Sequence, residues 1–384
     1  MLFSKGTFFL VLLAFILFLL LFLFKIKGDM VDFEVNYEAG KRLSLGETLY
    51  RVEDEHYMFK YLPASSILYL PLSYLSLDAA KAIWYFLVIF CSFSLVYVSY
   101  KVLPSREIKC IYVIVIPPLI LAKFFFREIQ LGQINALVAI ILLLMIWFLV
   151  YDKKLNPSNK EIFAGLLWGL GTALKPYALI FFPYFIVKKK WKSLLSGIGF
   201  LIAALWVPSL FYGFRGNALV FKEWVSTLSQ STPSLITSQD NISILAFFAK
   251  WTGNQNISLV LSGVIIAFLG FLFLFLVLKG KEIPRASVLE CSVLLILIPL
   301  ISPLGWDYTL LISVLGIMII VNYFFRFTRL WRGVLVVNFC IVSLSLYDIM
   351  GRGLYAQFMF WSVITINFLI TLGYLSYLRL RKVC

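Results

Sequence analysis

The run FFLVLLAFILFLLLFLF, from Phe8 to Phe24, decides what kind of protein this sequence encodes. It follows a single lysine, Lys5, and contains no charged or polar side chain. An apolar stretch of this length is typical of a membrane-spanning helix. Because no small-residue cleavage site precedes Lys25, we expect a retained first span rather than a removed signal, although a signal anchor has the same pattern.

The rest of the chain has the same apolar character. Of the 384 residues, 62% are hydrophobic and only 14% are charged. A soluble domain of this size does not have that balance. The sequence therefore predicts an all-α polytopic membrane protein, with residues 1–384 forming a single integral membrane domain.

A net charge of +15 raises the question of a nucleic-acid partner. The basic residues, however, fall in short clusters between apolar runs, such as Lys188 to Lys190, and the acidic residues concentrate in the complementary loops. This distribution is typical of membrane topology with positive loops inside. We therefore expect no nucleic-acid partner, a multi-pass protein of the inner (plasma) membrane, and both termini in the cytoplasm.

The alternation of basic and acidic loops predicts about twelve membrane-spanning helices. Residues 162–187 depart from it, because a run of about 26 residues is too short for two ordinary spans. Pro176 ends the helical ladder in its middle, so we expect a broken hairpin whose two short arms meet at Lys175 and line a cavity. Two outer loops, 25–81 and 211–257, are too long for turns, and we expect surface helices in both.

Asp32 lies shortly after the first span, in the triplet Asp32-Phe33-Glu34. Its carboxylate is either one of many acidic groups on a solvated loop or a general base that takes a proton from a bound hydroxyl. Two carboxylates without a neighbouring histidine make a poor site for a divalent metal, so no metal is expected. The sequence also lacks a glycine-rich phosphate-binding fingerprint, which argues against a soluble nucleotide donor and predicts no cofactor.

Three cations are candidates for binding a phosphate group. Lys175 lies inside an apolar segment, where a charge is costly; it either snorkels to the surface or binds a phosphate beside the membrane. Lys60 and Arg127 lie at the predicted outer boundary, where such residues are also ordinary anchors of span ends.

Polar and aromatic residues near that boundary are candidates for substrate binding. Gln133 and Asn135 open a predicted span, and their amides either hydrogen-bond sugar hydroxyls or cap the helix. Trp306, in an outer turn, either stacks on a sugar or belongs to the interfacial aromatic belt.

The order of several short motifs between about residues 28 and 310 resembles glycosyltransferase family 87. These motifs are Asp32-Phe33 with Tyr37, Phe59-x-Tyr61-x-Pro63, Gly132-Gln133-x-Asn135, Leu174-Lys175-Pro176-Tyr177, Asn241-x-Ser243 and Ser302-Pro303-x-x-Trp306. Family members are polytopic GT-C enzymes, and they include the mycobacterial polyprenol-phosphate-mannose-dependent α-mannosyltransferases. The resemblance therefore implies a GT-C-type helical bundle with an extracytoplasmic active site.

The resemblance also implies a reaction and partners: a sugar, most often mannose, moves from a polyprenyl-phosphate carrier to a hydroxyl of a lipid or glycan acceptor. Asp32 matches the family's base, and Tyr37, Asn241 and Asp307 join the candidate substrate-binding residues. Two departures bear on which donor and acceptor are used. Asp307-Tyr308 stands where the family has a histidine-rich sequence, and Leu62-Pro63 replaces a proline pair.

One carboxylate suffices for this chemistry, because a lipid phosphate leaves without an acid if cations stabilise its charge. A single displacement inverts the anomeric carbon. The main rival is a lipid or sugar transporter or flippase, which broken helices and a buried lysine also suit. A transporter is expected to show an internal repeat, and none is found in the sequence. A noncatalytic partner in envelope assembly is a third reading.

Overall fold

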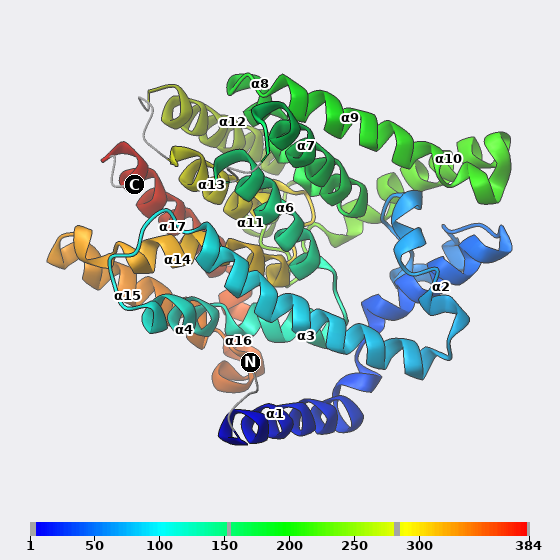
Figure 1. Cartoon of the computed structure of the whole chain (residues 1–384), viewed down its shortest axis with the longest axis horizontal. Coiled ribbons are helices and arrows are strands. Elements are labelled where there is room, and N and C mark those ends of the chain that lie inside the picture. Colours follow the sequence, from blue (N-terminus) through cyan, green and yellow to red (C-terminus); the bar gives the residue numbers. More distant parts are fainter. Residues whose placement is uncertain (1–4, 152–154, 280–284, 382–384) are drawn as a thin grey trace.

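The chain is all-helical over the residues that the structure, a computed structural model, describes: 5–151, 155–279 and 285–381 (Figure 1). No strand occurs in these three ranges, and extended segments pair there at one isolated antiparallel bridge, between Asn241 and Trp306. The predicted all-α class is therefore confirmed.

Three helices are long and apolar enough to cross a membrane: α3 (Leu77–Val102), α12 (Gln255–Lys279) and α17 (Val363–Leu380). Three bent pairs pass the same test when each pair is taken as one span. They are α4 (Cys110–Ile120) with α5 (Ala122–Leu131), α9 (Trp191–Trp206) with α10 (Ser209–Leu235), and α15 (Arg329–Leu344) with α16 (Tyr347–Phe360), bent by 61°, 91° and 100°. The described residues thus hold three to six candidate spans.

The expected count of about twelve spans is not confirmed, and helix length is the reason. Several apolar segments form helices of only 16 residues, including α6 (Asn135–Val150) and α13 (Ala286–Ile301). A helix of that length rises about 24 Å, which is less than the ~30 Å hydrocarbon core of a typical bilayer. Many of their apolar side chains are buried within the protein.

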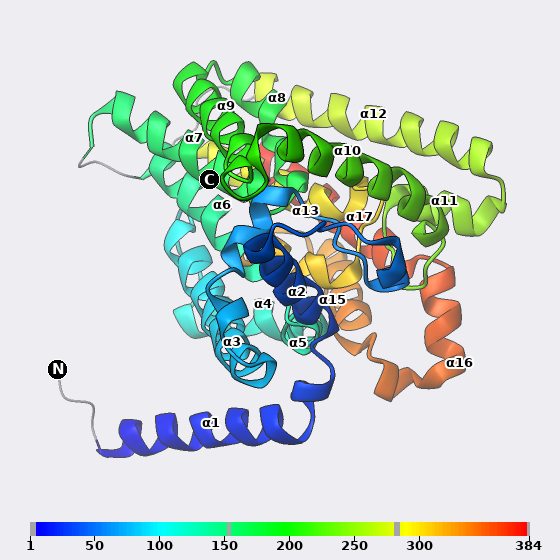
Figure 2. The ribbon, with the colours of Figure 1, turned by 90° about the vertical axis from the view of Figure 1, so that its right-hand side faces the viewer.

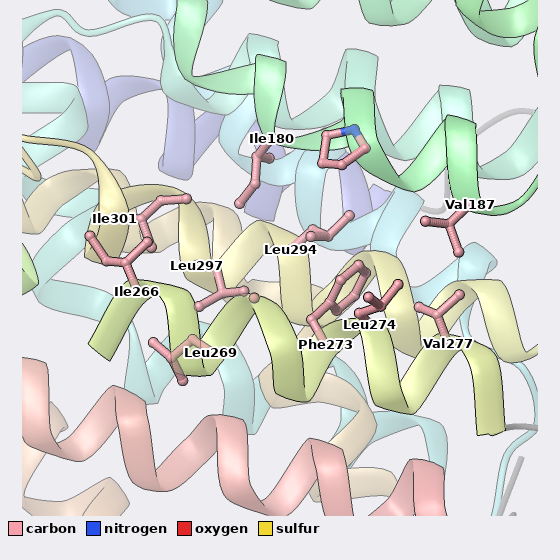
Figure 3. A pocket seen from close by; sticks show the side chains of 12 residues that line it. Ile180, Val187, Ile266, Leu269, Phe273, Leu274, Val277, Leu294, Leu297 and Ile301 are labelled. Atoms are coloured by element: carbon pink, nitrogen blue, oxygen red, sulfur yellow. The ribbon is translucent and has the colours of Figure 1, made fainter. Parts of the chain in front are cut away.

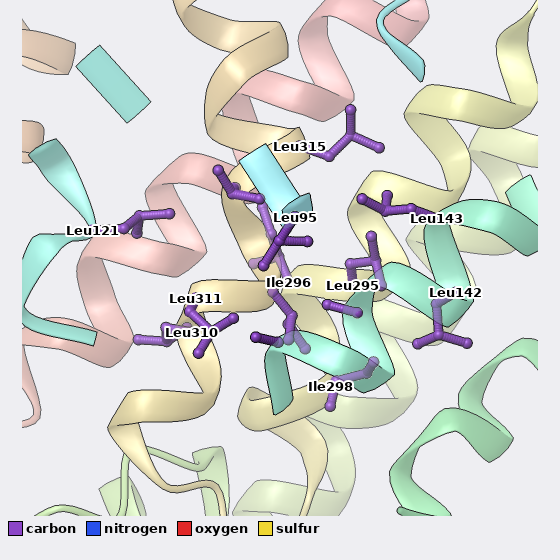
Figure 4. Packing of buried hydrophobic residues seen from close by; sticks show 14 of the residues in the cluster. Leu95, Leu121, Leu142, Leu143, Leu295, Ile296, Ile298, Leu310, Leu311 and Leu315 are labelled. Carbon is purple, nitrogen blue, oxygen red and sulfur yellow. The ribbon is translucent and has the colours of Figure 1, made fainter. Parts of the chain in front are cut away.

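The core of the molecule surrounds α13 and the helix α14 (Val314–Asn322), which follows the 3-10 helix η6 (Asp307–Ser313). Both helices are mostly apolar, with Glu290 of α13 as the one charged residue, and nearly every residue in them is buried, as expected for central helices. Leu295 and Ile296 of α13 pack among leucines from α3, α6 and η6 (Figure 4).

The first helix, α1 (Lys5–Phe24), lies at the edge of the bundle (Figure 2), and aromatic side chains of its second half contact α3. The rings of Phe22 and Tyr85 are 5.1 Å apart, and the Tyr85 hydroxyl donates to the Phe18 carbonyl at 3.0 Å. The opposite side of α1 is exposed, with Phe24 84% accessible. This apolar outer surface is suited to lipid.

Close helix packing fixes the segment that carries Lys175. Helix α7 (Pro157–Leu174) meets α9 through glycines, and a Cβ atom added to Gly165 would lie 2.1 Å from the Ser193 carbonyl oxygen. Small residues allow such close approach between helices. Helix α7 ends at Leu174, and Lys175 is extended (φ −142°, ψ 114°) before η5 (Pro176–Ile180) and α8 (Phe181–Val187). Residues 162–187 are therefore broken at Lys175 into unequal arms.

The two long segments 25–81 and 211–257 also contain helices. Residues 25–81 hold η1 (Ile26–Gly28), α2 (Val31–Leu45), η2 (Val52–Tyr57), η3 (Pro63–Leu68), η4 (Leu72–Tyr74) and the start of α3. Residues 211–257 hold most of α10, α11 (Ile244–Thr252) and the start of α12; η7 (Phe324–Arg326) follows α14. Helices α2 and α10 lie close to each other at one end of the molecule (Figures 1 and 2).

Candidate functional site

A cavity of about 920 Å³ opens between α2, α10 and the helix interruption at Lys175, where α7 ends and η5 begins. Six candidate site residues line it together: Asp32, Lys60, Arg127, Gln133, Lys175 and Trp306. They come from five separate stretches of the chain. The structure thus brings the candidate base and all three candidate phosphate-binding cations to one cavity.

Asp32 lies in the first turn of α2, where the helix N-terminus favours a negative charge. Its side-chain oxygen Oδ2 accepts a hydrogen bond from Gln133 Nε2 at 2.6 Å. The other two residues of the triplet point elsewhere, since Phe33 is fully buried and Glu34 forms an ion pair with Lys81. Asp32 is therefore the one carboxylate of the triplet that faces the cavity.

A tight turn places Gln133 beside Asp32. Gly132 ends α5 with φ at 68°, a left-handed conformation that glycine adopts without steric cost. A Cβ atom at this position would lie 2.7 Å from Cβ of Phe33. The indole of Trp84 donates to the Gly132 carbonyl at 2.7 Å, which holds the turn against α3.

Lys175 forms the rear wall of the cavity and is only 6% exposed. Its ammonium donates to Gln133 Oε1 and Asn135 Oδ1, both at 2.9 Å, and lies 5.0 Å from the centre of the Tyr61 ring. Gln133 consequently bridges the candidate base and this lysine, since its Nε2 contacts one and its Oε1 the other.

The other two cations differ in how their charge is used. Arg127 forms an ion pair with Asp240, with Nη2 2.7 Å from Oδ2. Burial raises the pKa of Asp240, and the neighbouring Asp307 raises it further, while Arg127 opposes both effects. Burial also lowers the pKa of Lys60, and the negative charge of Asp32 opposes that shift. The Lys60 ammonium is thus partly shielded from water.

Four candidate substrate-binding residues do not line the cavity, because their side chains are committed to other contacts: Tyr37, Asn135, Asn241 and Asp307. The Tyr37 hydroxyl donates to the Leu75 carbonyl at 2.7 Å, and Asn135 binds Lys175 from behind. The Asn241 amide donates to two backbone carbonyls, and Asp307 pairs with Lys123 at 2.9 Å. Asn241 and Asp307 hold the segment 211–257 against the turn that carries Trp306.

Aromatic residues that sequence reasoning did not select also line the cavity: Tyr61, Tyr177, Trp224 and Tyr308. The rings of Trp306 and Tyr308 are nearly parallel, 6.5 Å apart and inclined by 11°. Gln133 Nε2 lies 3.3 Å from the Tyr308 hydroxyl. Tyr61 and Tyr177 stand inside motifs quoted above, so their sequence signal was present, whereas nothing in the sequence distinguishes Trp224 from other interfacial tryptophans.

A second, wholly apolar pocket of about 360 Å³ lies between α8, α12 and α13 (Figure 3). Its lining includes Val187, Phe273 and Leu297. Ile180 and Ile301 line both this pocket and the polar cavity, so the two spaces are adjacent. Within the described ranges, no three His, Cys, Asp or Glu side chains are grouped so as to hold a metal ion.

Comparison with known proteins gives one match. The family model of glycosyltransferase family 87 matches residues 59–303, which is more than half of the chain. The matched range includes Lys60, Arg127, Gln133 and Lys175, whereas Asp32 lies well before its start and Trp306 just after its end. No curated protein and no solved structure gives a significant match.

Proposed function

Because the chain belongs to glycosyltransferase family 87, we propose that it transfers a sugar, most often mannose in this family, from a polyprenyl-phosphate carrier to a lipid or glycan hydroxyl. Transfer takes place with inversion at the anomeric carbon. The glycosyltransferase activity follows from the family; the lipid-borne donor, the sugar and the stereochemistry are our proposal.

One observation carries this proposal: Asp32 and Lys175 line the same cavity and are bridged by Gln133, at 2.6 Å and 2.9 Å. A general base must lie close to the hydroxyl that it deprotonates, and a leaving phosphate needs cations at its own end of the reaction. A donor whose phosphate binds near Lys175 presents its anomeric carbon toward the part of the cavity that Asp32 lines.

The reaction then needs one displacement. Asp32 takes the proton from the acceptor hydroxyl, the oxygen attacks the anomeric carbon, and the bond from that carbon to the phosphate oxygen breaks. Both electrons of that bond leave with the phosphate, whose charge Lys175, Lys60 and Arg127 stabilise. A β-linked donor gives an α-linked product. Trp306 and Tyr308 offer parallel ring faces on which a sugar stacks.

The apolar pocket supports a lipid-borne donor. It is adjacent to the polar cavity, because Ile180 and Ile301 line both spaces, so a carrier chain lying in it has its phosphate end beside the cavity that the three cations line. An apolar space of this kind suits an isoprenoid chain and does not suit a nucleotide. We propose further that the helices form a GT-C-type bundle of about twelve membrane-embedded segments in the inner membrane, with both termini cytoplasmic and the cavity on the extracytoplasmic side.

A transfer assay tests the function directly. The purified protein, reconstituted in lipid vesicles, is supplied with polyprenyl-phosphate mannose, polyprenyl-phosphate glucose or a nucleotide-linked sugar, together with a glycolipid acceptor. We expect transfer from a polyprenyl-phosphate sugar and an inverted linkage in the product. Transfer from the nucleotide sugar alone would contradict the proposal. Movement of the lipid donor across the bilayer without any transfer would favour a flippase instead.

A further inference from the structure

A chain of hydrogen bonds runs from Asp32 through the cavity wall to a second carboxylate, Glu128. Asp32 Oδ2 accepts from Gln133, whose Oε1 accepts from Lys175; Lys175 also donates to Asn135, whose Nδ2 donates to Glu128 Oε2 at 2.7 Å. Along this chain of hydrogen bonds the groups follow in the order carboxylate, amide, ammonium, amide and carboxylate. Every inner member is almost completely buried.

The lysine fixes the direction of this chain. An ammonium group can only donate hydrogen bonds, so the oxygens of both amides must face Lys175 and both amide NH₂ groups must face outward. Each NH₂ then meets a carboxylate. Glu128 also accepts from the backbone N–H of Ala136 at 2.8 Å, so its two oxygens each meet a donor.

Glu128 does not line the cavity and is fully buried, so it does not touch a substrate. Its influence passes through Asn135. Two of the three N–H bonds of Lys175 are directed at the two amide oxygens. The rings of Tyr61 and Tyr177 lie 5.0 and 5.9 Å from the ammonium, and a phosphate in the cavity would compete with these rings for the third N–H bond.

We propose that Glu128 is a positioning residue: by fixing the amide of Asn135, it holds the Lys175 ammonium in place with one N–H bond directed at the donor phosphate. This inference rests on the proposed function for the identity of the phosphate. The coupling of Glu128 to Lys175 is a property of the fold and is measured separately.

The substitution Glu128→Gln tests this geometry because a glutamine amide has one accepting and one donating end. Two donors, from Asn135 and Ala136, converge on the side chain, so one of them meets the new NH₂ group. Rotating the Asn135 amide relieves that contact but turns its NH₂ toward Lys175. The ammonium then loses an acceptor and moves from its position.

The first measurement is thermal stability of the full-length protein in detergent. Lys175→Met should lower Tm, because Glu128 loses the cation that compensates it. Adding Glu128→Gln to Lys175→Met should raise Tm again, since the uncompensated charge is removed. Glu290→Gln, a matched change at a buried carboxylate outside this chain, should lower Tm equally with and without Lys175→Met.

The second measurement is phosphate binding, read as the rise in Tm on adding geranylgeranyl phosphate, with geranylgeraniol as the control. Glu128→Gln should weaken the apparent affinity about tenfold, as for loss of one hydrogen bond to a charged group. In the Lys175→Met background it should cause no further loss. Wild-type-like binding by Glu128→Gln, or an additive fall in Tm in the double variant, would overturn the positioning role.

The two proposals fail in different ways. A wild-type protein that binds geranylgeranyl phosphate but transfers sugar from no polyprenyl-phosphate donor refutes the proposed function and leaves the Glu128 inference supported. A wild-type protein that transfers sugar while Glu128→Gln and Lys175→Met act independently refutes the inference alone.

Discussion

Two buried clusters of charged residues occupy different parts of the molecule and have different surroundings. In one, Glu290 of α13 is bound by Arg379 at 2.7 Å, Lys188 at 2.8 Å and the Tyr184 hydroxyl at 3.1 Å. None of these four residues lines the large cavity. In the other, Asp32 and Lys175 are joined only through Gln133 and both face about 920 Å³ of open space.

The difference shows that a buried charge alone does not identify an active site. Arg379, Lys188 and Tyr184 bind the Glu290 carboxylate directly, and none of these side chains faces the large cavity. Lys175 donates to neutral amides instead of directly to a carboxylate, so its charge remains available to a ligand. We therefore propose that the Glu290 cluster stabilises the fold and that the Asp32 cluster takes part in the reaction. Four substitutions and a pH profile test this division of roles.

The largest effect is expected from Asp32→Asn. An amide cannot take a proton from the acceptor, so kcat should fall by about 10²- to 10⁴-fold, while donor affinity changes little. Transfer from a polyprenyl-phosphate sugar and binding of the same donor are measured on the purified variant. Turnover close to wild type would remove Asp32 as the base.

Glu290→Gln should lower the stability of the protein and leave its activity unchanged. Arg379 and Lys188 would lose their buried counter-charge, and stability should fall by about 3 kcal/mol. Chemical denaturation in detergent measures this loss. Activity per folded molecule should stay unchanged, because no residue of this cluster lines the cavity. A large fall in kcat with normal stability would mean that the division is wrong.

Trp306→Ala should weaken acceptor binding about tenfold, since ring stacking contributes about 0.5–1.5 kcal/mol beyond burial. The acceptor KM is measured with the donor saturating. Trp361→Ala serves as the control, because Trp361 is 53% exposed and contacts Trp251 away from the cavity. Equal changes in both variants would indicate a general membrane-interface effect.

The smallest effect concerns pH. Lys60 carries its positive charge below its lowered pKa and loses it as pH rises through that value. Donor KM should therefore rise a few-fold on the alkaline side, at a lower pH than an ordinary lysine would give. Lys60→Arg should remove this rise because the guanidinium stays charged. An identical rise in Lys60→Arg would assign it to another group.

Parts of the site could be predicted because local chemistry marks them. A lysine before a proline in an apolar run, Lys175-Pro176, indicates a break in a helix and an unusual charge. Asp32, an acidic residue shortly after the first apolar run, is a similar local signal of a functional residue. Glu290 stands in an apolar run and could have been predicted by the same rule, whereas Glu128 directly follows Arg127 and has no such local signal.

The sequence could not show which side chains of one motif face the cavity and which face the protein interior. Trp306 lines the cavity while Asp307, its neighbour, turns inward to Lys123. Gln133 lines it while Asn135, two residues later, supports Lys175 from behind. Such differences depend on which neighbours pack around each side chain, and those neighbours come from distant parts of the chain.

By itself, the sequence determined the helical class, the membrane character and the family, because these depend on composition, apolar periodicity and the order of motifs. Only the tertiary structure decided that five distant stretches meet at one cavity and that several apolar segments form short helices of about 16 residues with many buried side chains. The physical reason is that hydrophobicity measures removal from water and does not specify whether lipid or protein replaces it. The spacing of Asp32, Gln133 and Lys175 is set by packing between helices, which no local stretch of sequence contains.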